Sequence, residues 1–391
     1  MKFVTVFLLV AFSFALLNAQ ERAYTDIQND GVISTQINLV NPSVTNPVVK
    51  ISVNAYDLRP VIVNGEETFV VDAPDFSRIL KAGAPDLVHF AKSVVIPDNG
   101  SMSYSVVSSD YFELQNVNIA PSKGNLLRTV NPDDVAYVYG AEYSQNAFYP
   151  SSVVSLQDPY IFRDLRGQVV DFTPFQYNPV TKVLRIYTEV TVELKHNSAP
   201  GLNEFTRSKA FASVDQEFNQ LYSRHFLNYN QTIAKYTPIS ETPGNILIIS
   251  YGSFIPDMQA FVDWKILKGI ETEIVDVATI GNTATAIKSF VTNYYNTNGL
   301  TFLLLVGDFA QVTSSTVTIN APKDIEYAYL TGNDHYPEFL VGRFTAETTA
   351  QVQTQVERSV FYEKTPASGD WYTKNIGIGS SEGPGHNGEY D

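Results

Sequence analysis

The sequence predicts a multidomain protein, with a β-sandwich-like domain followed by part of an α/β domain whose sheet is mainly parallel. The chain has 391 residues, enough for two or three domains. The first half alternates apolar and polar residues between turn signals, whereas the second half alternates short apolar runs with helical patterns. A hydrophobic content of 44% with only 17% charged residues supplies apolar material for sizeable cores.

The first 19 residues read as a signal peptide. Lys2 gives the positive start, an apolar run follows from Phe3 to Leu17, and Ala19 is a small residue before the expected cleavage at Gln20. The run is too short and too close to the terminus for a stable membrane span, and we expect no other span in the chain. The mature protein is therefore expected to be exported, to the extracellular space or the cell surface.

Strands dominate the region up to about residue 196, which predicts an antiparallel sandwich. The clearest strand is Lys182–Leu194, and similar patterns cover Val48–Tyr56 and Ser101–Val107, with turns such as Asn64-Gly65 between them. Alternation along the clearest strand predicts one buried and one exposed face. The expected buried residues are Leu184, Ile186, Val190, Val192 and Leu194, and the expected exposed residues are Arg185, Tyr187, Glu189, Thr191 and Glu193.

A polar connector follows, with one expected helix at Val214–His225, and the pattern changes at Asn245. Strand and helix then alternate, which indicates βαβ units. The expected strands are Ile246–Ile249, Ile274–Val277, Phe302–Val306, Phe339–Val341 and Asn375–Gly379. The expected helices are Pro256–Lys268, Thr285–Tyr295 and Glu347–Lys364, with Met258, Phe261, Val262 and Ile266 on the buried face of the first.

Composition excludes several classes of function. The net charge of −15 comes without a basic cluster, so nucleic acid is a poor partner because phosphate contacts need Lys and Arg. The acidity by itself indicates only solubility. The absence of cysteine excludes disulfides and a cysteine nucleophile within these 391 residues. The histidines have no metal-ligand spacing, and Ser381 lacks the glycine frame of a nucleophile elbow.

Acids that follow the expected strands are the candidate functional residues. Asp308 and Glu382 each come directly after an apolar run, and the carboxyl ends of parallel strands are where α/β proteins place ligands and chemistry. The alternative is that each is a helix N-cap or a solvated loop acid. The stretch Asn333–Glu338 is dense in oxygen ligands suited to Ca²⁺, with Asp334 and Glu338 as the acids. The alternative there is a polar turn before a strand.

Several motifs in the second half occur in an order and spacing that resemble a known family. They are Tyr236-Thr237-Pro238, Phe261-Val262-Asp263-Trp264-Lys265, Leu304-Leu305-Val306-Gly307-Asp308, Gly332-Asn333-Asp334-His335-Tyr336, Val341-Gly342-Arg343-Phe344 and the closing stretch from Ser380 to Asp391. Together they resemble the first half of the catalytic domain of gingipain-like cysteine peptidases, family C25, which has a caspase-like fold. The stretch Pro174–Pro179 and the strand after it resemble the β-rich propeptide of that family.

The resemblance implies roles for individual residues. Glu382 matches the acid that orients the catalytic histidine, and Asp391 matches the acid of the S1 pocket in arginine-specific members. Asp308, Asp334, Glu338 and Glu389 match calcium-site acids, with carbonyls from Thr331 and Tyr336. The family's catalytic histidine and cysteine would lie downstream of Asp391, so the chain reads as truncated within the catalytic domain and is expected to be inert by itself.

The resemblance therefore implies a secreted zymogen of a calcium-stabilised cysteine endopeptidase that acts on proteins and peptides. Its expected parts are a signal peptide (1–19), a propeptide with connector (20–235) that inhibits in the same molecule, and the start of the catalytic domain (236–391). Maturation in this family occurs before the Tyr-Thr-Pro segment. Lys235 precedes that segment here and is consistent with cleavage after Lys or Arg. The alternative is a non-catalytic secreted adhesion or interaction protein with a degenerate peptidase-like domain.

Overall fold

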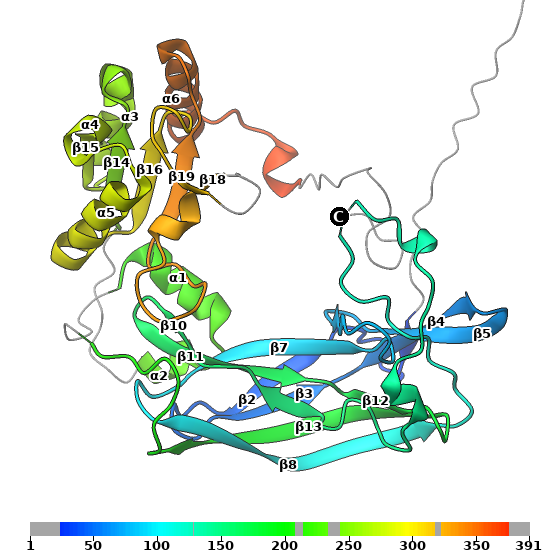
Figure 1. Cartoon of the computed structure of the whole chain (residues 1–391). Coiled ribbons are helices and arrows are strands. Elements are labelled where there is room, and N and C mark those ends of the chain that lie inside the picture. The colour runs from blue at the N-terminus through cyan, green and yellow to red at the C-terminus, as the bar shows by residue number, and fades with distance from the viewer. Residues whose placement is uncertain (1–23, 128, 208–213, 234–242, 317–321, 375–391) are drawn as a thin grey trace, which may run out of the picture.

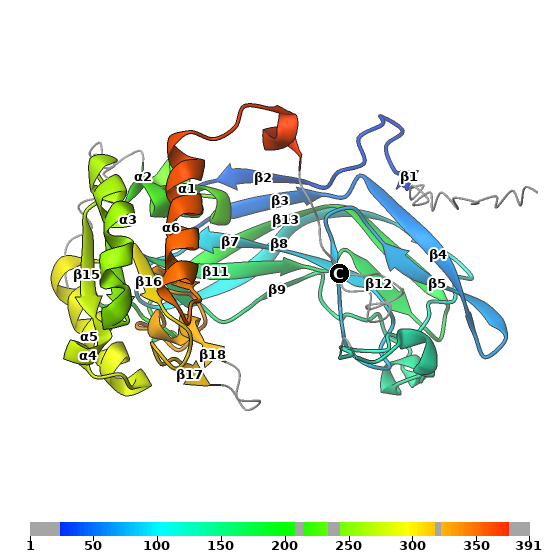
Figure 2. The same ribbon diagram turned by 90° about the horizontal axis from the view of Figure 1, so that it is seen from above.

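The computed structural model describes residues 24–127, 129–207, 214–233, 243–316 and 322–374, and these form two parts (Figure 1). The N-terminal part runs to residue 233 and the C-terminal part begins at residue 243. Seen from above, the N-terminal part is long and the C-terminal part packs against one end of it (Figure 2). The expected strand Asn375–Gly379 and the candidate residues Glu382, Glu389 and Asp391 lie outside the described residues.

Two antiparallel sheets face each other in the N-terminal part, and a third, smaller sheet extends them. The first has the order β12 (Phe175–Asn178), β13 (Val183–Asn197), β3 (Val48–Ser52), β2 (Gln36–Asn41), and β8 (Ser101–Leu114) also pairs with β13. The second has the order β10 (Tyr160–Phe162), β11 (Leu165–Phe172), β7 (Val88–Val95), β6 (Ser77–Arg78), and β9 (Val154–Leu156) pairs with β11. The third has the order β1 (Thr25–Asp26), β4 (Ala55–Val63), β5 (Glu66–Asp72).

A shared apolar core joins the first two sheets. Val49 and Ile51 of β3 and Val192 of β13 pack with Val94 of β7 and Phe172 of β11, and all five side chains are almost fully buried. Short 3₁₀ turns at Pro132–Asp134 and Ala141–Ser144 and the helices α1 (Gln216–His225) and α2 (Tyr229–Ile233) complete this part. The predicted helix Val214–His225 is therefore confirmed as α1, with Val214 just before it.

The strand β13 confirms the predicted alternation except at Tyr187. All five residues expected to be buried are at most 1% exposed. Tyr187, expected in water, is only 8% exposed because the pairing with β8 shifts between Tyr187 and Glu189, which leaves one extra residue on β13. Its hydroxyl donates to Gln176 Oε1 at 3.0 Å.

The single strand expected at Val48–Tyr56 is in fact two strands, β3 and β4, because the chain passes from one sheet to another at Asn54.

The C-terminal part contains a fully parallel sheet, as the sequence predicts. Its order is β15 (Thr272–Asp276), β14 (Ile246–Ser250), β16 (Phe302–Val306), β19 (Leu340–Phe344). The helices α3 (Ile255–Leu267) and α6 (Thr349–Lys364) share a core with one face, while α4 (Val277–Ile280) and α5 (Ala284–Asn298) lie on the other side. The minor elements are β17 (Ser315–Thr316), β18 (Pro322–Lys323) and 3₁₀ turns at Gly252–Phe254, Asp324–Tyr327 and Asp370–Thr373.

The helix α3 differs from its prediction at one position. Met258, Phe261 and Val262 are buried as expected, but Ile266 is 54% exposed. In the last turn of α3, the inward position belongs to Lys265, whose side chain is 12% exposed and whose ammonium contacts Glu363 of α6 at 2.5 Å. A long side chain can bury its apolar stem while its charged end finds a partner. The helical spacing of apolar residues alone does not predict that Lys265 rather than Ile266 faces inward.

Candidate functional site

The parallel sheet presents two edges, and the predicted site residues are divided between them. Asp308 follows β16 at the carboxyl edge, where its Oδ1 accepts the N–H of Phe309 at 2.8 Å. Its own N–H donates to the carbonyl of Ala346 at 2.8 Å, and its carbonyl accepts from Val312 at 2.9 Å. The carboxylate thus supports a local turn, a geometry that agrees with the loop-acid alternative.

The second group of predicted residues lies at the opposite, amino edge, in the loop before β19. Glu338 is completely buried, and its two carboxylate oxygens accept the N–H groups of Leu330 at 2.6 Å and Thr331 at 3.2 Å. Burial raises the pKa of Glu338 to about 7 against the lowering effect of these two bonds, and the charge of Asp334 raises it further. A carboxylate held in this way is costly to ionise unless a cation is close.

Lys288 of α5 forms hydrogen bonds with the backbone that leads into the same loop. Its ammonium donates to the carbonyls of Glu326 at 2.6 Å and Tyr329 at 2.7 Å, with Tyr327 at 3.3 Å. Burial lowers the pKa of Lys288, and the charges of Glu338 and Glu326 oppose that effect. The hydrogen bonds of Lys288 therefore fix the backbone of the loop, while Glu338 is held by backbone N–H groups.

Asp334 reaches across to the N-terminal part. Its Oδ1 accepts the N–H of Tyr336 at 3.0 Å, and its Oδ2 accepts the N–H of Ile161 in β10 at 2.8 Å. The neighbouring N–H of Asn333 donates to Asn203 Oδ1 at 3.1 Å. The loop predicted to bind calcium is therefore also a docking surface for the N-terminal part.

The predicted metal ligands consequently do not meet at one point. The five residues of β16 separate Asp308 from the amino edge, which corresponds to about 16 Å at the usual rise of a strand. A single Ca²⁺ binds its ligands at about 2.3–2.6 Å, so Asp308 and the 331–338 loop can serve only separate sites. Within the described ranges, no three or more His, Cys, Asp or Glu side chains gather closely enough to hold a metal.

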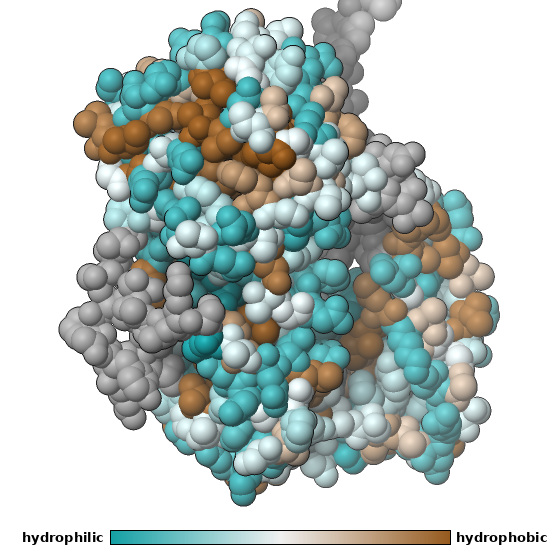
Figure 3. Space-filling model, turned by 60° about the vertical axis from the view of Figure 1, so that its left-hand side comes forward, coloured by the Kyte–Doolittle hydropathy of each residue, from teal (hydrophilic) through white to brown (hydrophobic). Residues whose placement is uncertain are grey.

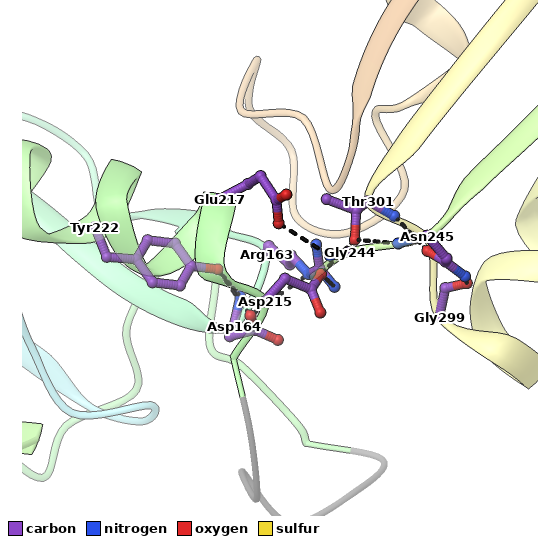
Figure 4. Close-up of polar contacts among 9 residues, drawn as sticks. All are labelled: Arg163, Asp164, Asp215, Glu217, Tyr222, Gly244, Asn245, Gly299 and Thr301. Carbon is purple, nitrogen blue, oxygen red and sulfur yellow. Dashed lines mark hydrogen bonds and ion pairs between the residues drawn. The ribbon is translucent and has the colours of Figure 1, made fainter. Parts of the chain in front are cut away.

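Sequence reasoning missed a second set of polar contacts between the two parts, around α1, which Figure 4 draws. Asp215 occupies the N-cap position of α1 but makes no side-chain capping bond. Its Oδ2 instead accepts from Arg163 Nη2 at 2.8 Å and from Thr301 Oγ1 at 2.5 Å. Glu217, in the first turn of α1, accepts the N–H of Gly244 at 3.1 Å. The two acids therefore tie α1 to the starts of β16 and β14.

Asn245 continues this network inside the C-terminal part. Its side chain accepts the N–H of Thr301 at 2.9 Å and donates to the carbonyl of Gly299 at 3.0 Å, which links the segments just before β14 and β16. A Cβ added at Gly244 would collide with the Thr301 side chain. The close approach at this point therefore requires glycine.

Arg163 is the most deeply placed charge of the junction. Its side chain is 11% exposed, and its guanidinium lies 4.1 Å from the centre of the Phe218 ring. Burial lowers the pKa of Arg163, but the charges of Asp164 and Asp215 more than offset this effect and raise it. Asp164 in turn accepts the hydroxyl of Tyr222 at 2.8 Å. The guanidinium is thus a fixed cation between α1 and the C-terminal part.

An aromatic cluster forms the other half of the junction. The rings of Tyr160 and Tyr336 stack with centroids 3.9 Å apart, and Phe162 lies 5.7 Å from Tyr336. The hydroxyl of Tyr160 is 2.6 Å from Nε2 of His225, whose pKa is lowered first by burial and then by the charge of Lys92. These residues are far apart in the sequence, so no periodic pattern of residues predicts their contacts. The charged pair Arg163-Asp164 between two apolar runs does, however, indicate a turn.

The C-terminal part also has an apolar hollow that contains none of the predicted site residues. A cavity of about 370 Å³ lies between the sheet and the helices α3 and α6. Its walls include Phe261, Phe302 and Phe344, with Lys265 and Glu363 among the lining residues. On the face drawn in Figure 3, an apolar band crosses the C-terminal part, whereas most of the remaining surface is polar. Within the described ranges, no helix has the length and apolarity needed to cross a membrane.

Two family models match the chain in succession. Propeptide_C25 matches residues 42–235 and Peptidase family C25 matches residues 239–391. Gingipain R1 of Porphyromonas gingivalis is 41% identical over 322 residues, which are 80% of this chain and 32% of that protein. Gingipain R2 of strain W83 is 38% identical over 333 residues, 82% of this chain and 45% of that protein. The chain thus spans less than half the length of these curated relatives.

Among solved structures, the complex of the pro- and mature domains of P. gingivalis RgpB is 35% identical, with a TM-score of 0.47 and coverage of 50% of this chain and 97% of that chain. Among the curated proteins, Lys-gingipain W83 of P. gingivalis is more distant than the two gingipains R, at 23% identity over 88% of this chain and 20% of that protein. The two consecutive models cover nearly all of the described residues, so the N-terminal part is a propeptide and the C-terminal part is peptidase sequence. The chain belongs to peptidase family C25.

Proposed function

We propose that this chain is the propeptide and the first part of the catalytic domain of a secreted, calcium-stabilised cysteine endopeptidase. The observation that carries the proposal is the succession of the propeptide and peptidase matches, in one chain whose two parts dock through a polar and aromatic junction. In the whole protein, a cysteine thiolate attacks the peptide carbonyl and a histidine transfers the proton. Glu382 accepts the other imidazole N–H and fixes its orientation.

The decisive experiment uses the longer protein. Reading the gene beyond Asp391 should reveal a histidine followed by a cysteine, and replacing that cysteine with alanine should abolish peptide hydrolysis while the protein still folds. If the downstream sequence lacks either residue, the enzyme proposal fails. The alternative, a secreted adhesion protein with a degenerate peptidase-like domain, would then account for the chain.

The propeptide is proposed to keep the enzyme latent within the same molecule. The junction supports its attachment, because Asp215, Ile161 and Asn203 of the propeptide all bond to the peptidase part. In the purified longer protein, peptide hydrolysis should rise when the propeptide is removed and fall again when it is returned. Equal rates with and without the propeptide would contradict latency.

Calcium is proposed to bind in the loop 331–338, with a separate site that uses Asp308. The chemistry of the loop suits this ion, since Asp334 and Glu338 offer carboxylates and Thr331 and Tyr336 offer carbonyls. The buried carboxylate of Glu338 supports the fit, because a nearby cation would lower its raised pKa. Glu389 is the further acid proposed from the resemblance.

Thermal unfolding tests the calcium proposal. A metal that binds only the native state raises stability, by about 2.7 kcal/mol at a concentration of 100 times Kd. The melting temperature should fall on addition of EDTA and recover with excess Ca²⁺ but less with Mg²⁺. Asp334→Asn should reduce this shift, whereas Asp263→Asn, at an exposed position of α3, is the control. A melting temperature that ignores EDTA in the unmutated chain would contradict calcium binding.

Cleavage specificity, export and the complete fold are proposed as well. Asp391 is proposed to contact a basic side chain of the substrate, and Lys235 to precede the maturation cut, so the enzyme would cleave after Lys or Arg. A mature N-terminus that starts elsewhere than Tyr236 and follows a non-basic residue would contradict that specificity. The signal peptide at residues 1–19 and a caspase-like fold of the complete catalytic domain are proposed from the same resemblance.

A further inference from the structure

The hairpin that carries Arg163 has an unusual residue at its tip. The strands β10 and β11 pair up to Phe162 and Leu165, so the loop between them has only two residues, Arg163 and Asp164. Arg163 has φ of +50°, in the left-handed region that L residues seldom occupy. In a two-residue hairpin with positive φ at its first loop position, glycine is the favoured residue. A large side chain at this position indicates that its contacts outweigh the local strain.

The guanidinium of Arg163 contacts both its own hairpin, where Nε lies 3.5 Å from Asp164 Oδ2, and the residues of the junction. Nη2 bonds to Asp215, which also accepts the hydroxyl of Thr301 in the peptidase part. On the same side, Tyr295 of α5 lies 6.0 Å from the guanidinium. Nη1 is buried, and no residue within the described ranges accepts a hydrogen bond from it. Arginine that is desolvated at the centre of an interface is typical of binding hot spots.

The junction is also separate from the place where chemistry is expected. Thr301 directly precedes β16 at the amino edge, whereas Asp308 follows β16 at the carboxyl edge, where α/β proteins place their reactions. A change at Arg163 therefore alters attachment of the propeptide without touching the residues of the carboxyl edge.

We propose that Arg163 is the residue by which the propeptide recognises its own peptidase and remains attached after the connector is cut. It holds Asp215 in position for Thr301, and the partner that it fits is a peptidase surface with a hydroxyl at position 301 and an aromatic ring at position 295. This inference rests on the proposed role of the N-terminal part as a latency propeptide and names the residue that governs its attachment.

The test uses the whole chain with a site-specific protease sequence inserted between Ile233 and Pro243 and an affinity tag on the propeptide. After cutting, the time course of peptidase release from the immobilised propeptide gives the dissociation rate. Arg163→Gly should release the peptidase at least about 30-fold faster than the unmutated chain, the range of a hot-spot residue. Arg163→Lys, which keeps the charge and loses the planar fork, should lie between the two.

Arg163→Gly is chosen because glycine suits the left-handed position, so the hairpin itself should remain intact. Arg185→Met is the matched control: Arg185 also bonds to a carboxylate and packs over aromatic rings in the propeptide, but its partners Glu113 and Phe148 lie outside the junction. This control should dissociate like the unmutated chain. Unchanged release from Arg163→Gly would overturn the proposal.

A second pair of variants approaches the contact from the peptidase side. Thr301→Val removes the hydroxyl that bonds to Asp215 and should speed release, whereas Thr301→Ser keeps it and should not. Equal release from both variants would also overturn the proposal. Because these readouts need no catalysis, they are independent of latency. If attachment of the propeptide depends on Arg163 but the propeptide does not inhibit the longer protein, then the latency proposal fails and the role of Arg163 in attachment stands.

Discussion

The two edges of the parallel sheet use acidic residues in different ways. At the amino edge, Asp215 and Asp334 make hydrogen bonds that cross between the propeptide and the peptidase part. At the carboxyl edge, Asp276 and Asp308 bond to N–H groups within their own turns. Attachment of the propeptide and the expected chemistry are therefore separated by the length of a strand. We therefore expect that a change at one edge leaves the hydrogen bonds of the other edge intact.

The largest effect should come from Glu382, the acid proposed to orient the catalytic histidine of the longer protein. Glu382→Gln should lower kcat by roughly 10²–10⁴-fold, because loss of the orienting acid leaves the histidine in the wrong tautomer. The rate at which the cut propeptide dissociates should not change. Steady-state hydrolysis and the release assay on the same variant measure both quantities. A variant with normal kcat would remove Glu382 from the proposed mechanism.

A steric change at the amino edge should have a moderate effect on stability. Gly244→Ala places a methyl group against the Thr301 side chain and should cost about 1–3 kcal/mol of unfolding free energy. Gly342→Ala in β19 is the matched control, since its nearest neighbour would be Leu304 Cδ1 at 4.0 Å. Denaturant unfolding of both variants compares them. Equal stabilities would mean that the approach of Gly244 to Thr301 is looser than described.

A smaller, pH-dependent effect is expected where α3 meets α6, away from both edges. Burial raises the pKa of Glu363, but hydrogen bonds from Lys265, Lys268 and Trp264 outweigh it and lower the pKa to about 2. The folded pKa lies below the unfolded value of 4.5, so this stabilisation is complete above pH 4.5 and is lost as the pH falls towards 2.

Because Glu363 is a quarter exposed, solvent screening limits its contribution to about 1–2 kcal/mol. Glu363→Gln should therefore lose about that much at pH 7, and the difference from the unmutated chain should shrink on acidification. Chemical unfolding at pH 7 and pH 3 measures this. Exposed Glu357 on the same helix supplies the control variant, Glu357→Gln. A difference that grows in acid would contradict the assigned cause.

The sequence predicted the regular elements well and the junction poorly, for physical reasons. The strand Phe302–Val306 has the predicted bounds because a buried parallel strand is a continuous apolar run. Tyr187 and Ile266 departed from their predicted faces because a shift in strand pairing and an inward lysine are tertiary events. Arg163 and Thr301 were missed because both bond to Asp215, and the bond from Thr301 forms only when two distant parts dock. The roles predicted for Glu382, Glu389 and Asp391 stay predictions.

The separation of the two edges is the central claim, and hydrogen–deuterium exchange on the whole chain tests it most directly. In the double variant Arg163→Gly and Thr301→Val, the amides of Ile161, Asn333 and Gly244, which donate across the junction, should exchange faster than in the unmutated chain. The amides of Asp308 and Val312, which bond within the carboxyl edge, should keep their protection. Equal loss of protection at both edges would contradict the claim.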